Sequence, residues 1–227
     1  MARPEAPLNC RPRRRQLASV LREARARKGV TYVDMAAHAG GISPATLKRI
    51  ASGNGPVPKW DNVLTYYKLC LPFADYAGST EPVVDFRRLR DVWVLARKEE
   101  RGTLHLKNQQ PRYICDESDL SRALYVLYEN AGAPSLRELQ RRAGGPLHLP
   151  LATAARIVTR RTIPSDTPQF KAFIEACSVP EREVKVWLEA WYRVNQTIKS
   201  YVRWEPGEQD WYPDVGPPEI RVRLRGE

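Results

Sequence analysis

Basic residues occur in two short stretches of the sequence, residues 43–52 and 150–160. The basic residues are Lys48 and Arg49 in the first stretch, and Arg156, Arg160 and the adjoining Arg161 in the second. Ammonium and guanidinium groups bind phosphate, and guanidinium does so through two parallel hydrogen bonds. These side chains are therefore candidates for holding a polyanion. The alternative is that each one is solvated or pairs with a neighbouring acid.

Residues suited to catalysis or metal binding are dispersed along the chain. The histidines, His38, His105 and His148, lie in different segments, with no paired carboxylates or cysteine at catalytic spacing near them. The cysteines, Cys10, Cys70, Cys115 and Cys177, form no CxxC or CxxH pair, which argues against a zinc site and for a reducing compartment. Phosphate loops of the GxxxxGK[ST] or GxGxxG type are absent. The sequence therefore predicts no enzyme, no cofactor and no metal site.

The chain carries a surplus of positive charge. It has 37 lysine and arginine residues against 26 aspartate and glutamate residues, for a formal net charge of +11. Such a surplus attracts nucleic acid or an anionic membrane, and the alternative is a merely soluble basic protein. No apolar run reaches the length of a membrane span, and no apolar segment follows the N-terminal charges as in a secretory signal. We therefore expect a cytoplasmic protein without a membrane partner.

The elements that must position the basic stretches are helices. Ser43 is a good N-cap, Pro44 suits the first helical position, and Gly53 can end the helix in a left-handed conformation. Apolar spacing predicts the other helices of the first half at residues 16–29, 32–39, 62–70 and 84–101. In the second half it predicts helices from Ser118 onward and at 136–143, 150–161, 168–177 and 180–201. Ser135 with Glu138, and Ser178 with Glu181, are expected to form capping boxes.

Three segments lack this helical pattern. TLHLK and RYIC, between residues 103 and 115, are candidates for two short strands, and EIRVRLR near the C-terminus alternates as a half-buried strand does. The N-terminal residues 1–15 are rich in proline and arginine. This segment is either a basic arm that lies along a nucleic acid or a solvated tail.

The two halves of the chain repeat each other. Thr46, Arg49, Ile50 and Cys70 have identical partners 107 positions later, at Thr153, Arg156, Ile157 and Cys177. The glycine pair at 40–41 recurs 104 positions later at 144–145, and Trp93 recurs 98 positions later as Trp191. The shared order of caps, glycines and cysteines predicts an internal duplication with a longer turn in the second copy.

Residues 16–71 resemble the Cro/repressor-type (XRE-type) helix-turn-helix DNA-binding domain. The resemblance rests on LREAR in the first helix, the turn AAHAGGIS, TLKRI in the third helix and the Pro-Lys-Trp start of the fourth. Residues 120–194 resemble a diverged copy of the kind common in actinobacterial regulators, through SLRELQRRAGG, TAARIVTRR and VKVWLEAWYRV. The resemblance implies an all-α fold of two tandem lambda-repressor-like domains, with a small β element from the linker and tail left open.

The resemblance also implies a division of the chain and a set of DNA contacts. The division is a basic flexible arm (1–15), a first domain ending in a long helix (16–101), a linker (102–117), a second domain (118–201) and a tail (202–227). Helices 43–52 and 150–160 would enter the major groove, which accepts an α-helix. The implied contacts are Ser43, Ala45, Thr46, Lys48 and Arg49 on the first helix, and Thr153, Arg156, Thr159, Arg160 and Arg161 on or beside the second. They also include Thr31, Lys59 and Trp60 at helix N-termini, and Arg13, Arg14 and Arg15 in the arm.

The expected function is sequence-specific binding of double-stranded DNA by a cytoplasmic, nucleoid-associated transcription regulator. The alternative is a protein-interaction adaptor that keeps the helix-turn-helix fold but binds a protein. Apolar Pro44 and Ala45 and the tryptophans Trp187, Trp191, Trp204 and Trp211 favour that alternative. A binder of RNA or single-stranded nucleic acid is a weaker third hypothesis, because the aromatic residues fall on helix stripes that usually pack in a core. A homodimer or another protein partner stays open.

Overall fold

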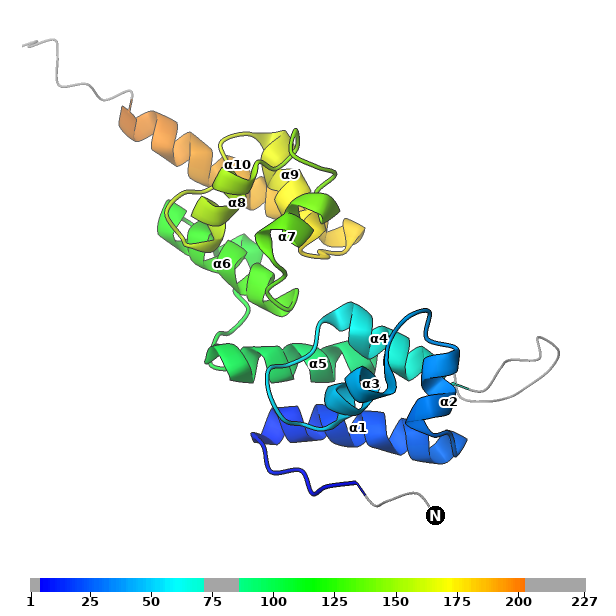
Figure 1. The fold of residues 1–227 in the computed structure, drawn as a ribbon. Helices are drawn as coiled ribbons and strands as arrows, with labels where there is room; N and C mark the ends of the chain where they lie inside the picture. The colour runs from blue at the N-terminus through cyan, green and yellow to red at the C-terminus, as the bar shows by residue number, and fades with distance from the viewer. Residues whose placement is uncertain (1–4, 72–85, 203–227) are drawn as a thin grey trace, which may run out of the picture.

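The computed structural model describes residues 5–71 and 86–202, and every regular element in these ranges is helical (Figure 1). The predicted all-α fold is confirmed. The first five helices are α1 (Pro12–Lys28), α2 (Tyr32–Ala37), α3 (Pro44–Ala51), α4 (Trp60–Leu69) and α5 (Phe86–Arg101). A 3-10 turn, η1 (Pro111–Tyr113), precedes α6 (Glu117–Asn130), α7 (Leu136–Arg142), α8 (Leu151–Val158), α9 (Thr167–Ala176) and α10 (Glu181–Val202).

The helices enclose two separate hydrophobic cores. In the first unit, α1–α5, the buried side chains include Leu17, Leu21, Leu47, Tyr66 and Trp93. In the second unit, α6–α10, they include Leu120, Leu139, Phe173, Trp187 and Trp191. Each amphipathic helix therefore buries its apolar stripe within its own unit, and burial of apolar surface is the main stabilising contribution to both units.

The two short strands predicted between residues 103 and 115 are wrong. Residues 103–110 make turns and irregular backbone, and residues 111–113 form η1. The segment is held by other contacts: the Thr103 N–H donates to the Lys98 carbonyl at 2.8 Å, and Ile114 is fully buried in the second core. The strand predicted near the C-terminus lies outside the described residues.

The start of α1 differs from the prediction. The helix begins at Pro12 rather than Gln16, so residues 12–15 are helical and the predicted flexible arm cannot extend through them. The Glu99 carboxylate of α5 supplies the reason, because it accepts hydrogen bonds from the N–H groups of Arg13 (3.0 Å) and Arg14 (3.2 Å). A carboxylate at a helix N-terminus satisfies free N–H groups and complements the helix dipole.

Glu99→Ala is expected to lower the free energy of unfolding by about 0.5–2 kcal/mol, the usual cost of removing an N-terminal cap. Urea unfolding followed by circular dichroism measures this change. Glu23→Ala is the matched control, since Glu23 is exposed on α1 and makes only a 3.9 Å ion pair with exposed Arg27. Equal losses in the two variants would contradict a capping role for Glu99.

One of the two predicted capping boxes is wrong and the other is half formed. Ser178 has φ 65° and its N–H donates to Glu175, so it ends α9 instead of starting α10. The Ser135 hydroxyl accepts from the Glu138 N–H at 3.3 Å, as predicted. The Glu138 carboxylate, however, pairs with Arg141 and Arg142.

The two units place equivalent features at the spacing found in the sequence. α4 and α9 start 107 positions apart and each has ten residues, and α3 and α8 each have eight. The residue after each of the latter two C-caps is left-handed, with φ 77° at Gly53 and 59° at Arg160. The Trp93 indole donates to the Pro58 carbonyl at 2.8 Å, and the Trp191 indole donates to the Pro164 carbonyl at 3.1 Å.

Candidate nucleic-acid interface

Helix α3 presents a polar and basic outer face. The Ser43 hydroxyl accepts from the Thr46 N–H at 3.2 Å and caps the helix as predicted. Leu47 and Ile50 are buried and attach the helix to its unit. The remaining predicted contacts point away from that core: Ser43, Ala45, Lys48 and Arg49 are exposed, and Thr46 is half-buried. Among the described residues, the side chains of Lys48 and Arg49 have no hydrogen-bond or ion-pair partner, so both are available to an external anion.

The N-terminus of α2 is closed by a full capping box. The Thr31 hydroxyl donates to the Asp34 carboxylate at 2.7 Å and accepts from the Asp34 N–H at 3.2 Å, while the Thr31 N–H donates to the same carboxylate. These hydrogen bonds lower the pKa of Asp34. Thr31 is exposed, as the prediction requires, but its hydroxyl is engaged inside the protein.

The N-terminus of α4 brings Lys59 and Trp60 to the same side of the first unit as the end of α3. Lys59 is exposed and is another cation with no partner in the part of the chain that the structure describes. Trp60 packs on Trp93, with ring centroids 5.5 Å apart, and Arg90 lies over its ring at 4.7 Å. Lys59 is thus available for an anion, whereas the Trp60 ring is largely occupied by packing.

Helix α8 is the counterpart of α3 in the second unit, and Ala154 and Ile157 bury its inner face. Thr153 is half-buried and Arg156 is exposed, as expected for outward positions. The helix ends at Val158, so Arg160 and Arg161 lie beyond it and not on it. The Thr159 hydroxyl donates to the Ala155 carbonyl at 2.7 Å and is engaged at the helix end. Arg156, Arg160 and Arg161 are exposed and have no partner within residues 5–71 and 86–202.

The three arginines predicted to contact DNA from the N-terminal arm, Arg13, Arg14 and Arg15, form hydrogen bonds within the protein. Arg14 is only 5% exposed, its Nη2 donates to the Ile50 carbonyl at 3.4 Å, and its Nε and Nη1 have no partner. Burial lowers the pKa of Arg14. Arg13 and Arg15 are exposed but bond to Gln16 and to the Cys10 carbonyl. The prediction that Arg14 contacts DNA is therefore wrong, because the side chain lies between α1 and the end of α3.

Arg14→Met is expected to leave the free energy of unfolding unchanged or to raise it by about 1 kcal/mol, since an apolar side chain avoids the cost of a poorly paired buried charge. Chemical denaturation measures the change. Arg22→Met is the control: Arg22 pairs with Glu5 and donates to the Ala6 and Ala51 carbonyls, so its loss should destabilise. Destabilisation by Arg14→Met as large as that by Arg22→Met would contradict the interpretation.

A cleft of about 630 Å³ lies where the two units meet. The first unit lines it with Thr46 and Arg49 from α3 and with Lys59 and Trp60 from α4, and the second unit with Ser135, Glu138 and Arg142 from α7 and its cap. Hydrogen bonds from Arg141 and Arg142 lower the pKa of Glu138 to about 2, so this acid is ionised and paired. Asp61 also lines the cleft, and neither Lys59 nor Arg49 forms an ion pair with it or with Glu138 in the described part of the chain.

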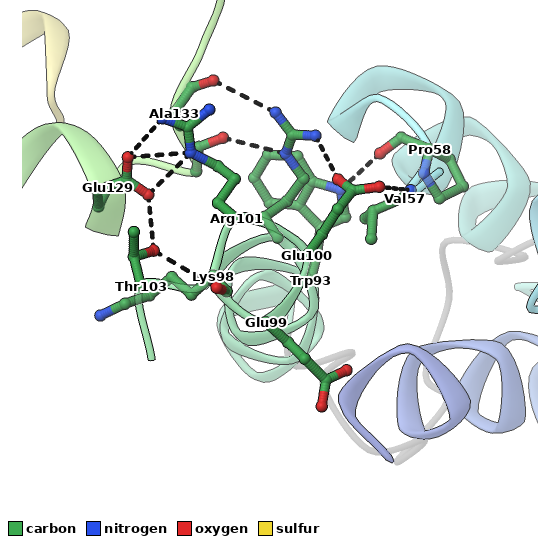
Figure 2. A network of polar contacts seen from close by, with 12 residues as sticks. Val57, Pro58, Trp93, Lys98, Glu99, Glu100, Arg101, Thr103, Glu129 and Ala133 are labelled. Carbon is green, nitrogen blue, oxygen red and sulfur yellow. Dashed lines mark hydrogen bonds and ion pairs between the residues drawn. The ribbon is translucent and has the colours of Figure 1, made fainter. Parts of the chain in front are cut away.

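Polar contacts that the sequence did not reveal join the two units (Figure 2). Arg101 of α5 binds Glu129 of α6 through three hydrogen bonds of 2.7–3.0 Å, and Thr103 donates to the same carboxylate at 2.9 Å. Figure 2 shows α5 nearly end-on, with Glu129 on one side, Val57 and Pro58 on another, and Glu99 directed toward a third helix. No local pattern indicates these pairs, because each joins residues that are distant in the sequence.

Residues 16–70 match the family model of a helix-turn-helix domain, which supports DNA as a partner. The match covers α2–α4 and α1 from Gln16 onward, and it includes the exposed face of α3. No curated protein and no solved structure matches the chain. Within the described ranges, no helix has both the length and the apolar character needed to cross a membrane.

Proposed function

We propose that this protein binds double-stranded DNA sequence-specifically, as a transcription regulator of the XRE type. The observation that carries the proposal is the outer face of α3: within a matched helix-turn-helix domain, exposed Lys48 and Arg49 have no partner among the described residues. Arg binds guanine O6 and N7 bidentately, and Ala45 or Thr46 suits a thymine methyl. Lys59, at the N-terminus of α4, would contact a neighbouring phosphate.

We further propose that the second unit is a diverged copy of the first. Helices α3 and α8, and α4 and α9, have equal lengths, and buried Cys70 and Cys177 cap the latter pair. The tryptophan-to-proline hydrogen bonds also occur in both units. In this proposal the domains are residues 16–101 and 118–201 with a linker at 102–117. Residues Thr153, Arg156, Arg160 and Arg161 would contact DNA beside α8.

Selection of duplexes from a random pool, followed by titration of the best sequence, tests the proposed function. We expect tight, sequence-dependent binding whose affinity falls steeply with salt, by a log–log slope of about 0.9 for each phosphate contacted. Absence of DNA affinity at low salt would refute the proposal. A protein partner that stays bound after Lys48, Arg49, Arg156 and Arg160 are neutralised would favour an adaptor instead.

A further inference from the structure

The C-terminus of α6 is held against α5 by arginines. The Nη2 group of Arg90 donates to the Ala131 carbonyl at 2.9 Å, and Arg97 donates to the Gly132 and Ala133 carbonyls at 3.4 and 3.5 Å. Cations at a helix C-terminus satisfy its free carbonyls and complement the dipole. The C-terminal end of α6, in the second unit, is therefore held against α5, the last helix of the first unit. We call this contact between α5 and residues 129–133 the joint.

Two buried contacts make this joint specific. The Glu129 side chain is fully buried, and Arg101 and Thr103 supply its charge-assisted hydrogen bonds (Figure 2). Trp93 lies directly on the backbone of Gly132, where an added Cβ would overlap the indole ring. Gly132 also has φ +86°, which side-chain-bearing residues rarely adopt. A close-packed contact with buried ion pairing does not slide continuously, so it fixes the orientation of the two units.

The joint connects unlike elements of the two units. α5 is the last helix of the first unit. It corresponds to α10, since Trp93 and Trp191 make equivalent hydrogen bonds to proline carbonyls in their units. α6 opens the second unit and corresponds to α1. A two-fold relation would also require α1 to meet α10, because an isologous contact occurs twice. Figure 1 shows α1 and α10 at opposite ends of the molecule with α5 and α6 between them. The units are therefore arranged head to tail.

The outer faces of α3 and α8 share three residues in sequence. At the shift of 107 positions, Ala45, Thr46 and Arg49 correspond to identical Ala152, Thr153 and Arg156. Other proposed contact positions differ: Ser43 and Lys48 correspond to Pro150 and Ala155, and Gly53 and Asn54 stand where the second unit has Arg160 and Arg161. If both helices read bases, they should read similar elements.

We propose that one protein chain reads two similar base-sequence elements in the same orientation at one fixed spacing, a direct repeat in place of a palindrome. The inference rests on the proposed function of both units. Two equivalent binding positions on the backbone of B-DNA are related in one of two ways. A two-fold axis perpendicular to the duplex gives inverted sequence elements, and a screw rotation along the duplex axis gives elements in the same orientation. A rigid head-to-tail pair is incompatible with the first relation. The cleft lined by Arg49 and Lys59 would then lie where the backbone passes from one unit to the other.

The motif obtained by selection with the full chain provides the test. We expect two similar elements in the same orientation, and at least about tenfold weaker binding when one element is inverted or moved by half a helical turn. A palindromic motif, a single element, or equal binding at all spacings would overturn the inference while leaving DNA binding intact. Failure to bind any duplex would instead refute the proposed function.

Gly132→Val links the spacing preference to the joint. It should abolish the preference for one spacing while a duplex with one element is still bound. Gly29→Val is the matched control, since Gly29 has φ +70° but no atom within 4 Å of an added Cβ, and it ends α1 away from the joint. Arg90→Ala with Arg97→Ala weakens the joint more gently if Gly132→Val fails to fold. A spacing preference that survives in the folded joint variants would show that the joint does not set it.

Discussion

Replacing Lys48 and Arg49 together with alanine is expected to lower affinity for the selected duplex by a factor of about 10²–10³, because one good base contact contributes about 1–3 kcal/mol. Both side chains are exposed on α3 and have no hydrogen-bond or ion-pair partner among the described residues, so their removal breaks no such interaction there. Affinity for unrelated DNA should fall less, and the salt slope should shrink by up to about 2. Fluorescence-anisotropy titrations at several salt concentrations measure all three quantities.

The control for this double variant is Lys68→Ala with Arg122→Ala, which removes the same charge from exposed positions outside α3 and α8. Long-range attraction alone would make the two double variants equally weak. A specific contact predicts that the control keeps its preference for the selected duplex and loses only a small part of its affinity. Thermal unfolding should be unchanged in the Lys48 and Arg49 variant, and a lower melting temperature would point to a structural role.

The parts of this fold that were predictable from the sequence are those fixed by local signals. Ser43, Pro44 and Gly53 lie within eleven residues of one another, and together they placed both ends of α3 to within one residue. Burial of Leu47 and Ile50 followed from their spacing. The exposed basic residues of α3 could be selected for the same reason, because a helix of known register leaves only one face for a ligand.

The failures arise where a distant residue decides the local structure. α1 extends to Pro12 because Glu99, more than 80 positions away, caps it, and this helix places Arg14 inside the protein. Ser178 resembles an N-cap in the sequence, yet the αL conformation ends the preceding helix there. The joint depends on Trp93 meeting Gly132 and could not be predicted, since neither residue is unusual in its own segment.

Trp93→Ala and Trp191→Ala are each expected to lower the free energy of unfolding of their unit by about 3–5 kcal/mol, the usual cost of truncating a buried aromatic residue. The side chains are 5% and 6% exposed and lie in separate cores. Domains are stable by only about 5–15 kcal/mol, so either loss removes a large fraction of the total. Urea unfolding by circular dichroism measures both. Trp60→Ala is the control, because Trp60 is only half-buried at the edge of the same packing.

Phenylalanine at the same positions separates packing from hydrogen bonding. Trp93→Phe keeps much of the ring but leaves the Pro58 carbonyl without its donor, and Trp191→Phe does the same to Pro164. A lost buried hydrogen bond costs about 1–3 kcal/mol, so similar losses in both variants are expected if the units are copies. Trp93→Ala should also loosen the joint, because only Trp93 packs on Gly132. We therefore expect folded Trp93→Ala to lose the preference for one spacing of the two DNA elements and folded Trp191→Ala to keep it. That result would show that the core of the first unit fixes the orientation of the second unit. Identical spacing preferences in the two variants would contradict this coupling.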